Sequence, residues 1–270
     1  NVTAKAGVVR GQALGAGANF LDLDGDGLLD LFVSNYVDFT YENHRTVTLR
    51  GRSDYAGPRD YSPKPNSLYF NRGDGTFADV SSESGIAAHA GSGMGTVCLD
   101  YDRDGRTDIF VCNDQRWDFL FHNLGGGKFE EAGLQAGVAC NFSGAPTSSM
   151  GADAGDYDND GRLDLLVTDY FNEMCVLHHN LGDGQFEDAA AQAGLGVRAT
   201  AYVKWGCGMV DFDSDGWKDI FIGCGHIYKD IDVVSGGGAY ELRPILFRNL
   251  GNGRFDNVTD SGGDGMRVRM

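Results

Sequence analysis

The motif Asp-x-Asp-x-Asp-Gly-x-x-Asp occurs four times in this chain, at residues 22–30, 100–108, 156–164 and 211–219. In each copy three carboxylates occupy alternate positions, a glycine stands at position six, and a fourth carboxylate stands at position nine. Glycine permits the sharp backbone bend that brings such side chains together. Carboxylate oxygens in this number are the ligands that Ca²⁺ prefers. The sequence therefore predicts a repeat protein built around calcium-binding loops.

The EF-hand is the main competing interpretation of these loops. It shares the first half of the motif, but it requires a bidentate Glu at position twelve and a helix on either side. Position twelve is occupied here by Val33, Val111, Val167 and Ile222. The loops also run directly into LDLFVSNY, TDIFVCND, LDLLVTDY and KDIFIGCG, which are rich in β-branched and aromatic residues, as buried strands are. Strand flanks exclude the EF-hand.

A second repeated element follows each calcium loop: NSLYFNRGDGTFADV, DFLFHNLGGGKFEEA, CVLHHNLGDGQFEDA and PILFRNLGNGRFDNV. The pattern predicts a hairpin in which one strand ends in Asn, a Gly-x-Gly turn follows, and the next strand begins with Phe. We expect Gly and Asn to supply the positive φ of the turn and the Phe to pack between neighbouring sheets. The residues concerned are Asn71 and Phe77, Asn123 and Phe129, Asn180 and Phe186, and Asn249 and Phe255.

Each repeat is thus predicted to contain four antiparallel strands. Repeats of about 40 to 60 residues with this content are typical of β-propeller blades, whereas a calcium-binding β-helix uses repeats of about nine residues. The 41 glycines, only five prolines and 41% hydrophobic residues favour a well-packed all-β protein with many tight turns. We expect one domain over residues 1–270, with blades at about 14–82, 93–133, 149–190 and 205–260.

The net charge of −17 mainly reflects the calcium loops, which hold 16 of the 39 acidic residues. This acidity argues against nucleic-acid binding, which depends on Lys and Arg. No segment approaches the apolar length of a membrane span, so none is expected. Open calcium sites of this kind usually operate where calcium is abundant, with dissociation constants of about 10⁻⁴ to 10⁻³ M. We therefore expect a secreted, cell-surface or periplasmic location.

The six cysteines show neither the CxxC spacing nor the CxxCH haem motif. Cys98 and Cys112, and likewise Cys207 and Cys224, lie on the two strands that flank one calcium loop. Folding each hairpin about its loop places the two members of a pair close to opposite one another, where a cross-strand disulfide can form. Buried free thiols are an equally good interpretation, and Cys140 and Cys175 have no predicted partner.

The DxDxDGxxD loop, the xLYxNxGxGxFxDV hairpin and linkers such as ESGIA, QAGVA and QAGLG together resemble the FG-GAP/VCBS repeat of integrin α-subunit propellers. The resemblance is greatest to the bacterial and animal group related to cartilage acidic protein, which often carries an ASPIC/UnbV domain. It covers nearly the whole chain. No segment similar to ASPIC/UnbV is visible in the sequence.

The resemblance implies about four Ca²⁺ ions, one per blade, bound by the side chains at loop positions one, three, five and nine and by the carbonyl of position seven. The implied ligands are Asp22, Asp24, Asp26, Leu28 and Asp30 in blade 1; Asp100, Asp102, Asp104, Arg106 and Asp108 in blade 2; Asp156, Asp158, Asp160, Arg162 and Asp164 in blade 3; and Asp211, Asp213, Asp215, Trp217 and Asp219 in blade 4.

Propellers of this family usually have seven or more blades, whereas the motifs here define four. The chain opens with NVTAKAGVV, which matches the tail of a blade, and closes with FDNVTDSGGDGMRVRM, the same tail followed by a linker-like segment. We therefore expect part of a larger, seven- or eight-bladed propeller. A closed four-bladed ring is the alternative.

Catalytic motifs are not apparent: the sequence contains no GxSxG, HExxH or P-loop. Paired carboxylates occur only inside the calcium loops, and the six histidines are dispersed. His122 and His179 stand at the same hairpin position of successive blades, where we expect them to pack or to face solvent. The sequence therefore favours a protein that is not an enzyme, in which calcium has a structural role.

Two long connections break the repeat, at residues 36–66 in blade 1 and 225–243 in blade 4, and both are rich in Tyr. Because antiparallel strands alternate in direction, both are expected on the face opposite the calcium loops. Long loops on rigid scaffolds often form binding surfaces; the alternative is that these two connections only cover the face of the propeller or pack on adjacent blades. We favour a binding or adhesion module for a protein or glycan partner; the alternatives are a structural subunit of a larger assembly and an accessory domain of an enzyme.

Overall fold

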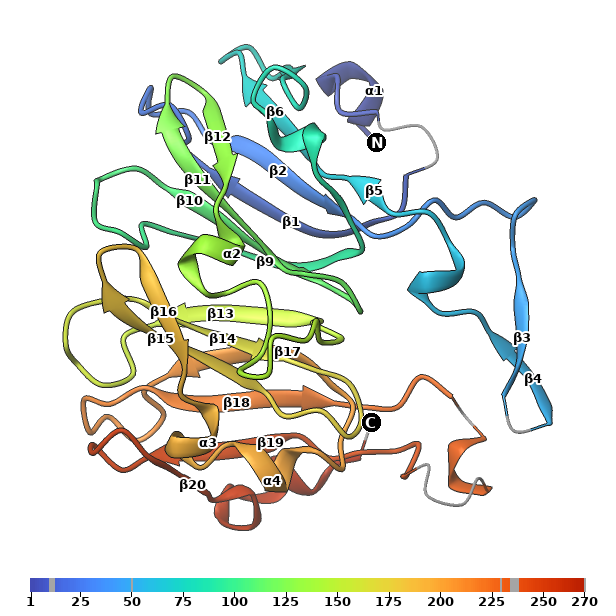
Figure 1. Ribbon diagram of the computed structural model, residues 1–270, viewed down its shortest axis with the longest axis vertical. Coiled ribbons are helices and arrows are strands. Elements are labelled where there is room, and N and C mark those ends of the chain that lie inside the picture. The colour runs from blue at the N-terminus through green and yellow to red at the C-terminus, as the bar shows by residue number, and fades with distance from the viewer. Residues whose placement is uncertain (10–12, 50, 229, 234–237, 270) are drawn as a thin grey trace.

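The computed structural model describes residues 1–9, 13–49, 51–228, 230–233 and 238–269 (Figure 1). Most of the structure consists of four four-stranded antiparallel sheets, and in each sheet the strands pair in chain order. This confirms the expected all-β fold of blade-like units. Blade 1 contains β1 (Gly15–Leu21), β2 (Asp30–Asn35), β6 (Ser67–Asn71) and β7 (Phe77–Asp79). Blade 2 contains β9 (Gly93–Leu99), β10 (Asp108–Asn113), β11 (Phe119–Gly125) and β12 (Lys128–Glu131). Blade 3 contains β13 (Gly151–Gly155), β14 (Asp164–Thr168), β15 (Val176–Gly182) and β16 (Gln185–Asp188). Blade 4 contains β17 (Lys204–Val210), β18 (Asp219–Cys224), β19 (Ile245–Asn249) and β20 (Phe255–Asn257).

Smaller elements connect and decorate the blades. The four-residue helices are α1 (Thr3–Ala6), α2 (Gly133–Ala136), α3 (Ala190–Ala193) and α4 (Gly196–Ala199). Two short sheets pair β3 (Thr46–Leu49) with β4 (Arg52–Tyr55) and β5 (Lys64–Pro65) with β8 (Ala90–Gly91). The 3₁₀ helices cover Pro58–Asp60, Ile86–Ala88, Ile231–Val233, Thr259–Ser261 and Asp264–Arg267. None of the described helices has the length and apolar character needed to cross a membrane.

The second strands of the two inner blades, β10 and β14, are buried on both faces because each lies between two other blades. Every residue of β10 is buried. Ile109 belongs to the apolar cluster shared with blade 1, whereas the next residue, Phe110, belongs to the cluster shared with blade 3. Strands covered on both faces have continuous hydrophobic runs, and burial of each such side chain stabilises the fold by about 1.5–3 kcal/mol. The hydrophobic core is therefore distributed between adjacent blades.

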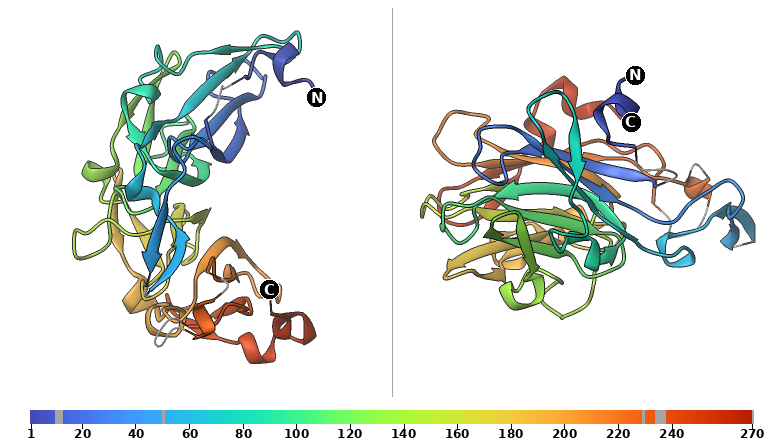
Figure 2. Two further views of the ribbon diagram at one scale, coloured as in Figure 1. Left: turned by 90° about the vertical axis from the view of Figure 1, so that its right-hand side faces the viewer. Right: turned by 90° about the horizontal axis from the view of Figure 1, so that it is seen from above.

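The first strands lie side by side on the inner side of the molecule. β9 contacts both β1 and β13, β13 contacts β17, and these strands line a cavity of about 310 Å³. Glycine is required where they meet: a Cβ at Gly95 would lie 2.6 Å from the Met150 carbonyl oxygen of the next blade. Among the described residues, nothing lies within 4 Å of a Cβ built at Gly206, the corresponding position of blade 4. Figure 2 shows the reason, since the blades form an open arc with blades 1 and 4 at its ends.

The hairpin Asn of blades 2, 3 and 4 joins each of these blades to the preceding one. Asn123 Nδ2 donates a hydrogen bond to the Leu23 carbonyl oxygen in the calcium loop of blade 1, at 3.2 Å. Asn180 bonds Tyr101 in the same way at 2.9 Å, and Asn249 bonds Tyr157 at 2.8 Å. Each of these calcium loops is thus held by the following blade.

The conformation of the Gly turn differs in one respect from the sequence-based expectation. The predicted positive φ occurs at the glycines, such as Gly73 (74°) and Gly75 (84°), but at none of the four Asn residues. The prediction for Asn was wrong: Asn71 Oδ1 instead accepts a hydrogen bond from the Gly73 N–H at 3.0 Å. The predicted packing of the Phe is confirmed, because Phe186 lies 6.0 Å from the Tyr101 ring of the preceding blade.

The six cysteines are free thiols in this structure, so the disulfide interpretation was wrong. The strand registers explain the difference: Cys98 lies opposite Ile109, and Cys207 lies opposite Ile222. The members of each expected pair are therefore offset along their strands. Burial raises the pKa of the Cys98 thiol to about 12, which keeps it protonated and unreactive.

Candidate functional site

The four Asp-rich loops connect the first and second strands of each blade, at the left in Figure 1. In blade 1 the loop follows β1, and its ninth residue, Asp30, begins β2. Single carboxylate oxygens of three loop residues lie within 4.8 Å of one another in three of the blades, in the sets Asp22, Asp24 and Asp30; Asp100, Asp102 and Asp104; and Asp156, Asp158 and Asp164. Several hard oxygen donors at this spacing suit a divalent cation such as Ca²⁺, so these residues would hold the predicted ions.

The backbone of each loop wraps around the first carboxylate. In blade 1, Asp22 accepts hydrogen bonds from the N–H groups of Gly25 (2.8 Å) and Gly27 (3.0 Å). The position-seven residues, whose carbonyls are implied ligands, each donate their N–H to the position-five carboxylate; they are Leu28, Arg106, Arg162 and Trp217. The expected bend at position six is present, with φ from 83° to 91° at Gly27, Gly105, Gly161 and Gly216.

Position four of the loop also has positive φ, which the sequence did not indicate. It is Gly25 in blade 1, but Arg103 (64°), Asn159 (59°) and Ser214 (61°) stand there in the other blades. A non-glycine residue in this conformation costs about 1–2 kcal/mol. Because the residue type varies, the pattern carried no signal. The hydrogen bonds of the loop maintain this unfavourable backbone conformation.

The carboxylate at position nine has a structural role that the sequence did not reveal. Asp30 is buried, and it accepts hydrogen bonds from the N–H groups of Leu23 (3.0 Å) and Asn71 (2.9 Å). It therefore ties the loop to the third strand of its own blade. The same two bonds recur for Asp108 with Tyr101 and Asn123, for Asp164 with Tyr157 and Asn180, and for Asp219 with Phe212 and Asn249.

The third-strand residue just before the hairpin Asn reaches back to the calcium loop. In blade 2 it is His122, whose Nδ1 lies 3.2 Å from Asp108 Oδ1 and 3.6 Å from Asp102 Oδ2, a cluster that can also bind a metal ion. His179 makes the corresponding contacts in blade 3. The expectation that these rings pack is confirmed, since His122 meets Tyr101 edge-on at 5.7 Å, but its contact with the carboxylates was missed.

In blade 4 the same position holds an arginine. Arg248 Nε lies 2.7 Å from Asp213 Oδ2, and a second guanidinium nitrogen lies 3.2 Å from Asp215 Oδ2. These are the position-three and position-five carboxylates of that loop. The four loops are therefore chemically different: the position is Phe70, His122, His179 or Arg248. Aligning the hairpins would have shown this series.

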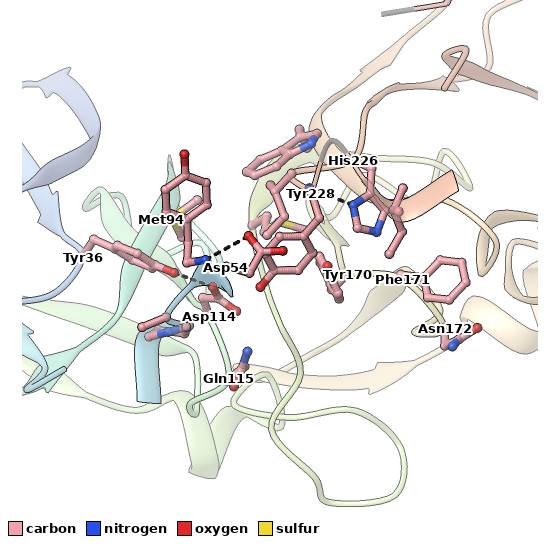
Figure 3. A pocket seen from close by; sticks show the side chains of 18 of the residues that line it. Tyr36, Asp54, Met94, Asp114, Gln115, Tyr170, Phe171, Asn172, His226 and Tyr228 are labelled. Carbon is pink, nitrogen blue, oxygen red and sulfur yellow. Dashed lines mark hydrogen bonds between the residues drawn. The ribbon is translucent and has the colours of Figure 1, made fainter. Parts of the chain in front are cut away.

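A pocket of about 480 Å³ lies at the opposite ends of the second strands (Figure 3). Tyr36, Asp114, Tyr170 and His226 each line it and stand one or two residues after the second strand of their blade. The two connections singled out from the sequence, 36–66 and 225–243, therefore meet here, although residues 50, 229 and 234–237 of them lie outside the described residues. The structure also adds residues from blades 2 and 3, which the sequence did not indicate.

The polar groups of the pocket are largely engaged with one another. Tyr36 donates its hydroxyl to Asp114 Oδ2 at 2.7 Å, and Trp205 donates Nε1 to the Gly225 carbonyl oxygen at 2.7 Å. Burial raises the pKa of Asp114, although the hydrogen bond from Tyr36 opposes this change. Burial also lowers the pKa of His226, whose Nδ1 accepts the Tyr228 N–H at 3.1 Å.

A buried lysine supports one wall of the pocket. The Lys204 side chain has no exposed surface, and its Nζ donates to the carbonyl oxygens of Tyr170 (3.1 Å) and Glu173 (2.9 Å). It also reaches two carbonyls next to α4, those of Ala199 and Tyr202. Lys204 therefore holds the loop that carries Tyr170 against the segment that leads to its neighbour Trp205.

The family model described as FG-GAP-like repeat matches residues 22–111 and 100–167. Cartilage acidic protein 1 of Xenopus tropicalis is 30% identical over 179 residues, which cover 60% of this chain and 25% of that protein. The Homo sapiens protein is 27% identical over 180 residues, 60% of this chain and 24% of that protein. The chain thus spans about a quarter of the length of these curated relatives.

A solved Agrocybe aegerita lectin, described as recognising non-reducing terminal N-acetylglucosamine, aligns with 88% of this chain and 64% of its own, at 20% identity and a TM-score of 0.38. That superposition is too loose to support an argument about function. The family match, by contrast, covers more than half of the chain, and its residues include the first three metal loops. The chain belongs to the FG-GAP-like repeat family and is a distant homologue of cartilage acidic protein 1 over 60% of its length.

Proposed function

We propose that this chain is a calcium-stabilised, non-catalytic binding module that recognises an extracellular protein or glycan partner through the pocket opposite its calcium loops. The observation that carries the proposal is the pocket itself. It is formed where residues from all four blades meet the two connections that depart from the repeat. Its volume of about 480 Å³ lies within the range of about 300–1,000 Å³ typical of ligand sites.

The position of the metal loops supports a structural role for calcium. Loop and pocket lie at opposite ends of the same strands, and a six-residue strand such as β10 is about 20 Å long. An ion in the loop is therefore remote from a ligand in the pocket. When bound, it would neutralise carboxylates that otherwise repel one another.

The chemistry of the pocket supports binding without catalysis. Among the described lining residues there is no Ser, Cys or Lys to act as a nucleophile. Asp114 and His226 are both engaged within the pocket, the first by Tyr36 and the second by the Tyr228 N–H. Such contacts fix the shape of a site before a ligand arrives, which reduces the cost of binding.

Further blades would complete the propeller. Blades 1 and 4 lie at the ends of an open arc, and the open space beside Gly206 corresponds to the place where Gly95 meets the next blade (Figure 2). Phe212, the blade 4 counterpart of Tyr101, is 52% exposed. We propose that a blade of the same type covers this side in the complete protein.

The pocket can be tested with a fragment library in calcium-containing buffer, using ligand-observed NMR. Replacing Ala56, which lines the pocket, with Trp would fill it, and fragments that bind there should be lost. The control is Ala191→Trp, at an exposed position of α3. A library whose hits all persist in Ala56→Trp, or that gives no hits, would refute the pocket as a recognition site.

A further inference from the structure

The pocket is rich in aromatic rings and carboxylates and poor in bases. Its rings include Tyr36, Tyr170, Phe171, Trp205 and Tyr228. Figure 3 shows the rings of Tyr36, Tyr170 and Tyr228 near the carboxylates of Asp54 and Asp114. The acidic residues that line it are Asp54, Asp114 and Asp230, and none of its described lining residues is Lys or Arg.

Two donors of the pocket are directed at acceptors of the protein itself. The Tyr36 hydroxyl donates to Asp114, and the Trp205 indole N–H donates to Gly225. The other polar side chains that line the pocket are the carboxylates and neutral groups such as Gln115 and Asn172, and the rings present electron-rich faces. Carboxylates and the faces of aromatic rings both attract positive charge.

The carboxylates carry an electrostatic cost that a cation would relieve. Burial is the largest cause of the raised pKa of Asp114, and the Glu173 charge adds to it. The charge of Arg59 opposes the rise in the pKa of Asp114, but the Arg59 guanidinium itself contacts the Gln115 carbonyl oxygen, at 3.5 Å. Burial, Asp54 and Asp114 together raise the pKa of the Tyr228 hydroxyl.

We propose that this pocket binds an organic cation, an alkylammonium or guanidinium group, between its aromatic rings and the carboxylates of Asp54 and Asp114. The inference rests on the proposed function, because it specifies the ligand of the same site. An anion would meet only like charge there. A neutral sugar can stack on Trp205 and donate hydroxyls to the carboxylates, but it gains nothing from the net negative charge.

Isothermal titration calorimetry with the intact chain in calcium buffer tests the charge requirement. The probes are Nα-acetyl-lysine methyl ester, its arginine counterpart, the neutral isostere Nα-acetyl-norleucine methyl ester, and n-butylamine. We expect the two cationic esters to bind and the norleucine ester to bind at least about tenfold more weakly, because one charge contact of about 1.4 kcal/mol gives that ratio. Binding of butylamine as tight as that of the lysine ester would identify a free amine as a sufficient ligand; weaker binding would favour a basic side chain presented by a peptide.

Isosteric variants locate the site. Asp54→Asn and Asp114→Asn should each weaken binding of the lysine ester about tenfold, whereas Asp256→Asn, at an exposed position of β20, should leave it unchanged. Asp54 lies on β4, outside the blades, so its replacement does not disturb their packing. Equal affinity for the neutral ester, an unchanged affinity in both variants, or no binding of either cationic ester would overturn the cation assignment. The fragment experiment with Ala56→Trp would still decide separately whether the pocket binds ligands at all.

Discussion

Arg248 Nε lies 2.7 Å from Asp213 Oδ2, so the calcium loop of blade 4 has a cation of its own. The third-strand position that carries this arginine is Phe70 in blade 1, which cannot form an ion pair. The guanidinium contributes positive charge to its loop, as Arg106 and Arg162 do in blades 2 and 3, where they pair with Asp104 and Asp160. The position of Arg106 and Arg162 is Leu28 in blade 1. The repeated motif therefore conceals a difference in how strongly the loops should bind calcium.

We predict that the loop of blade 4 binds calcium more weakly than the loop of blade 1 and that Arg248→Phe strengthens it. An exposed ion pair of this kind corresponds to a change of about fivefold or less in affinity. Calcium titration of the purified chain should resolve this site from the rest. The matched control is Arg254→Phe, at an exposed position of the adjacent Gly turn. Identical titration curves for Arg248→Phe and the unmodified chain would contradict the prediction.

Removal of calcium should lower the thermal stability of the chain. At a concentration ten times the dissociation constant, each bound ion stabilises the folded state by about 1.4 kcal/mol. Asp22→Ala should reduce the difference between the melting temperatures in calcium and in EDTA, because it removes one site. Comparing that difference separates the metal effect from the loss of the hydrogen bonds to Gly25 and Gly27. A melting temperature that EDTA leaves unmoved would show that the loops do not bind calcium.

Two equivalent glycines should respond differently to substitution. A Cβ at Gly95 would lie 2.6 Å from the Met150 carbonyl oxygen, whereas nothing among the described residues lies within 4 Å of one at Gly206. Gly95→Ala forces adjacent backbones apart and should cost about 1–3 kcal/mol. Gly206→Ala should be neutral in this chain. Urea unfolding of both variants measures the contrast, and similar losses would mean that the inner strands do not pack as described.

His178 should make stability depend on pH. Its ring is fully buried, its Nδ1 lacks a partner among the described residues, and burial lowers its pKa to about 4. The unfolded chain, with an ordinary pKa of about 6.5, binds the proton first as the pH falls. Stability is therefore lost between about pH 6.5 and 4, by about 3 kcal/mol in full.

The variant His178→Phe isolates this effect, because the equivalent residues of blades 2 and 4 are Phe121 and Phe247. Melting temperatures of the variant should fall less between pH 7.5 and 4.5 than those of the unmodified chain. Burial raises the pKa of Asp108 and Asp164 to about 6, so these carboxyls also take up protons in this range in both proteins. Because the folded state binds those protons before the unfolded chain does, their uptake adds stability as the pH falls and opposes the loss from His178. An equal change in the two proteins would show that His178 does not contribute to the pH dependence.

Local features of the site could be predicted because their parts are close together in the chain. The loop residues Asp22 to Asp30 and the hairpin between Asn71 and Phe77 are each formed within ten consecutive residues. Other features could not be predicted because they depend on which residues of two strands pair, or on which blade lies next to another. Whether Cys98 faces Cys112 depends on which residues of β9 and β10 pair, and spacing alone placed Cys98 wrongly. The hydrogen bond from Asn123 to Leu23 joins two blades, and no local sequence pattern indicates it.

The sequence by itself determined the repeating unit: the Asp-rich loops, their strand flanks and the Gly-turn hairpins are set by short-range backbone preferences and by carboxylates within nine residues of one another. Only the tertiary structure decided which residues of different repeats come together. Tyr36, Asp114, Tyr170 and His226 come from four different blades, and they share one pocket because apolar faces pack between neighbouring second strands. Within blade 4, the pairing of β18 with β19 places Arg248 beside the Asp-rich loop. Packing of distant segments, which the order of residues does not reveal, thus created the differences between otherwise similar repeats.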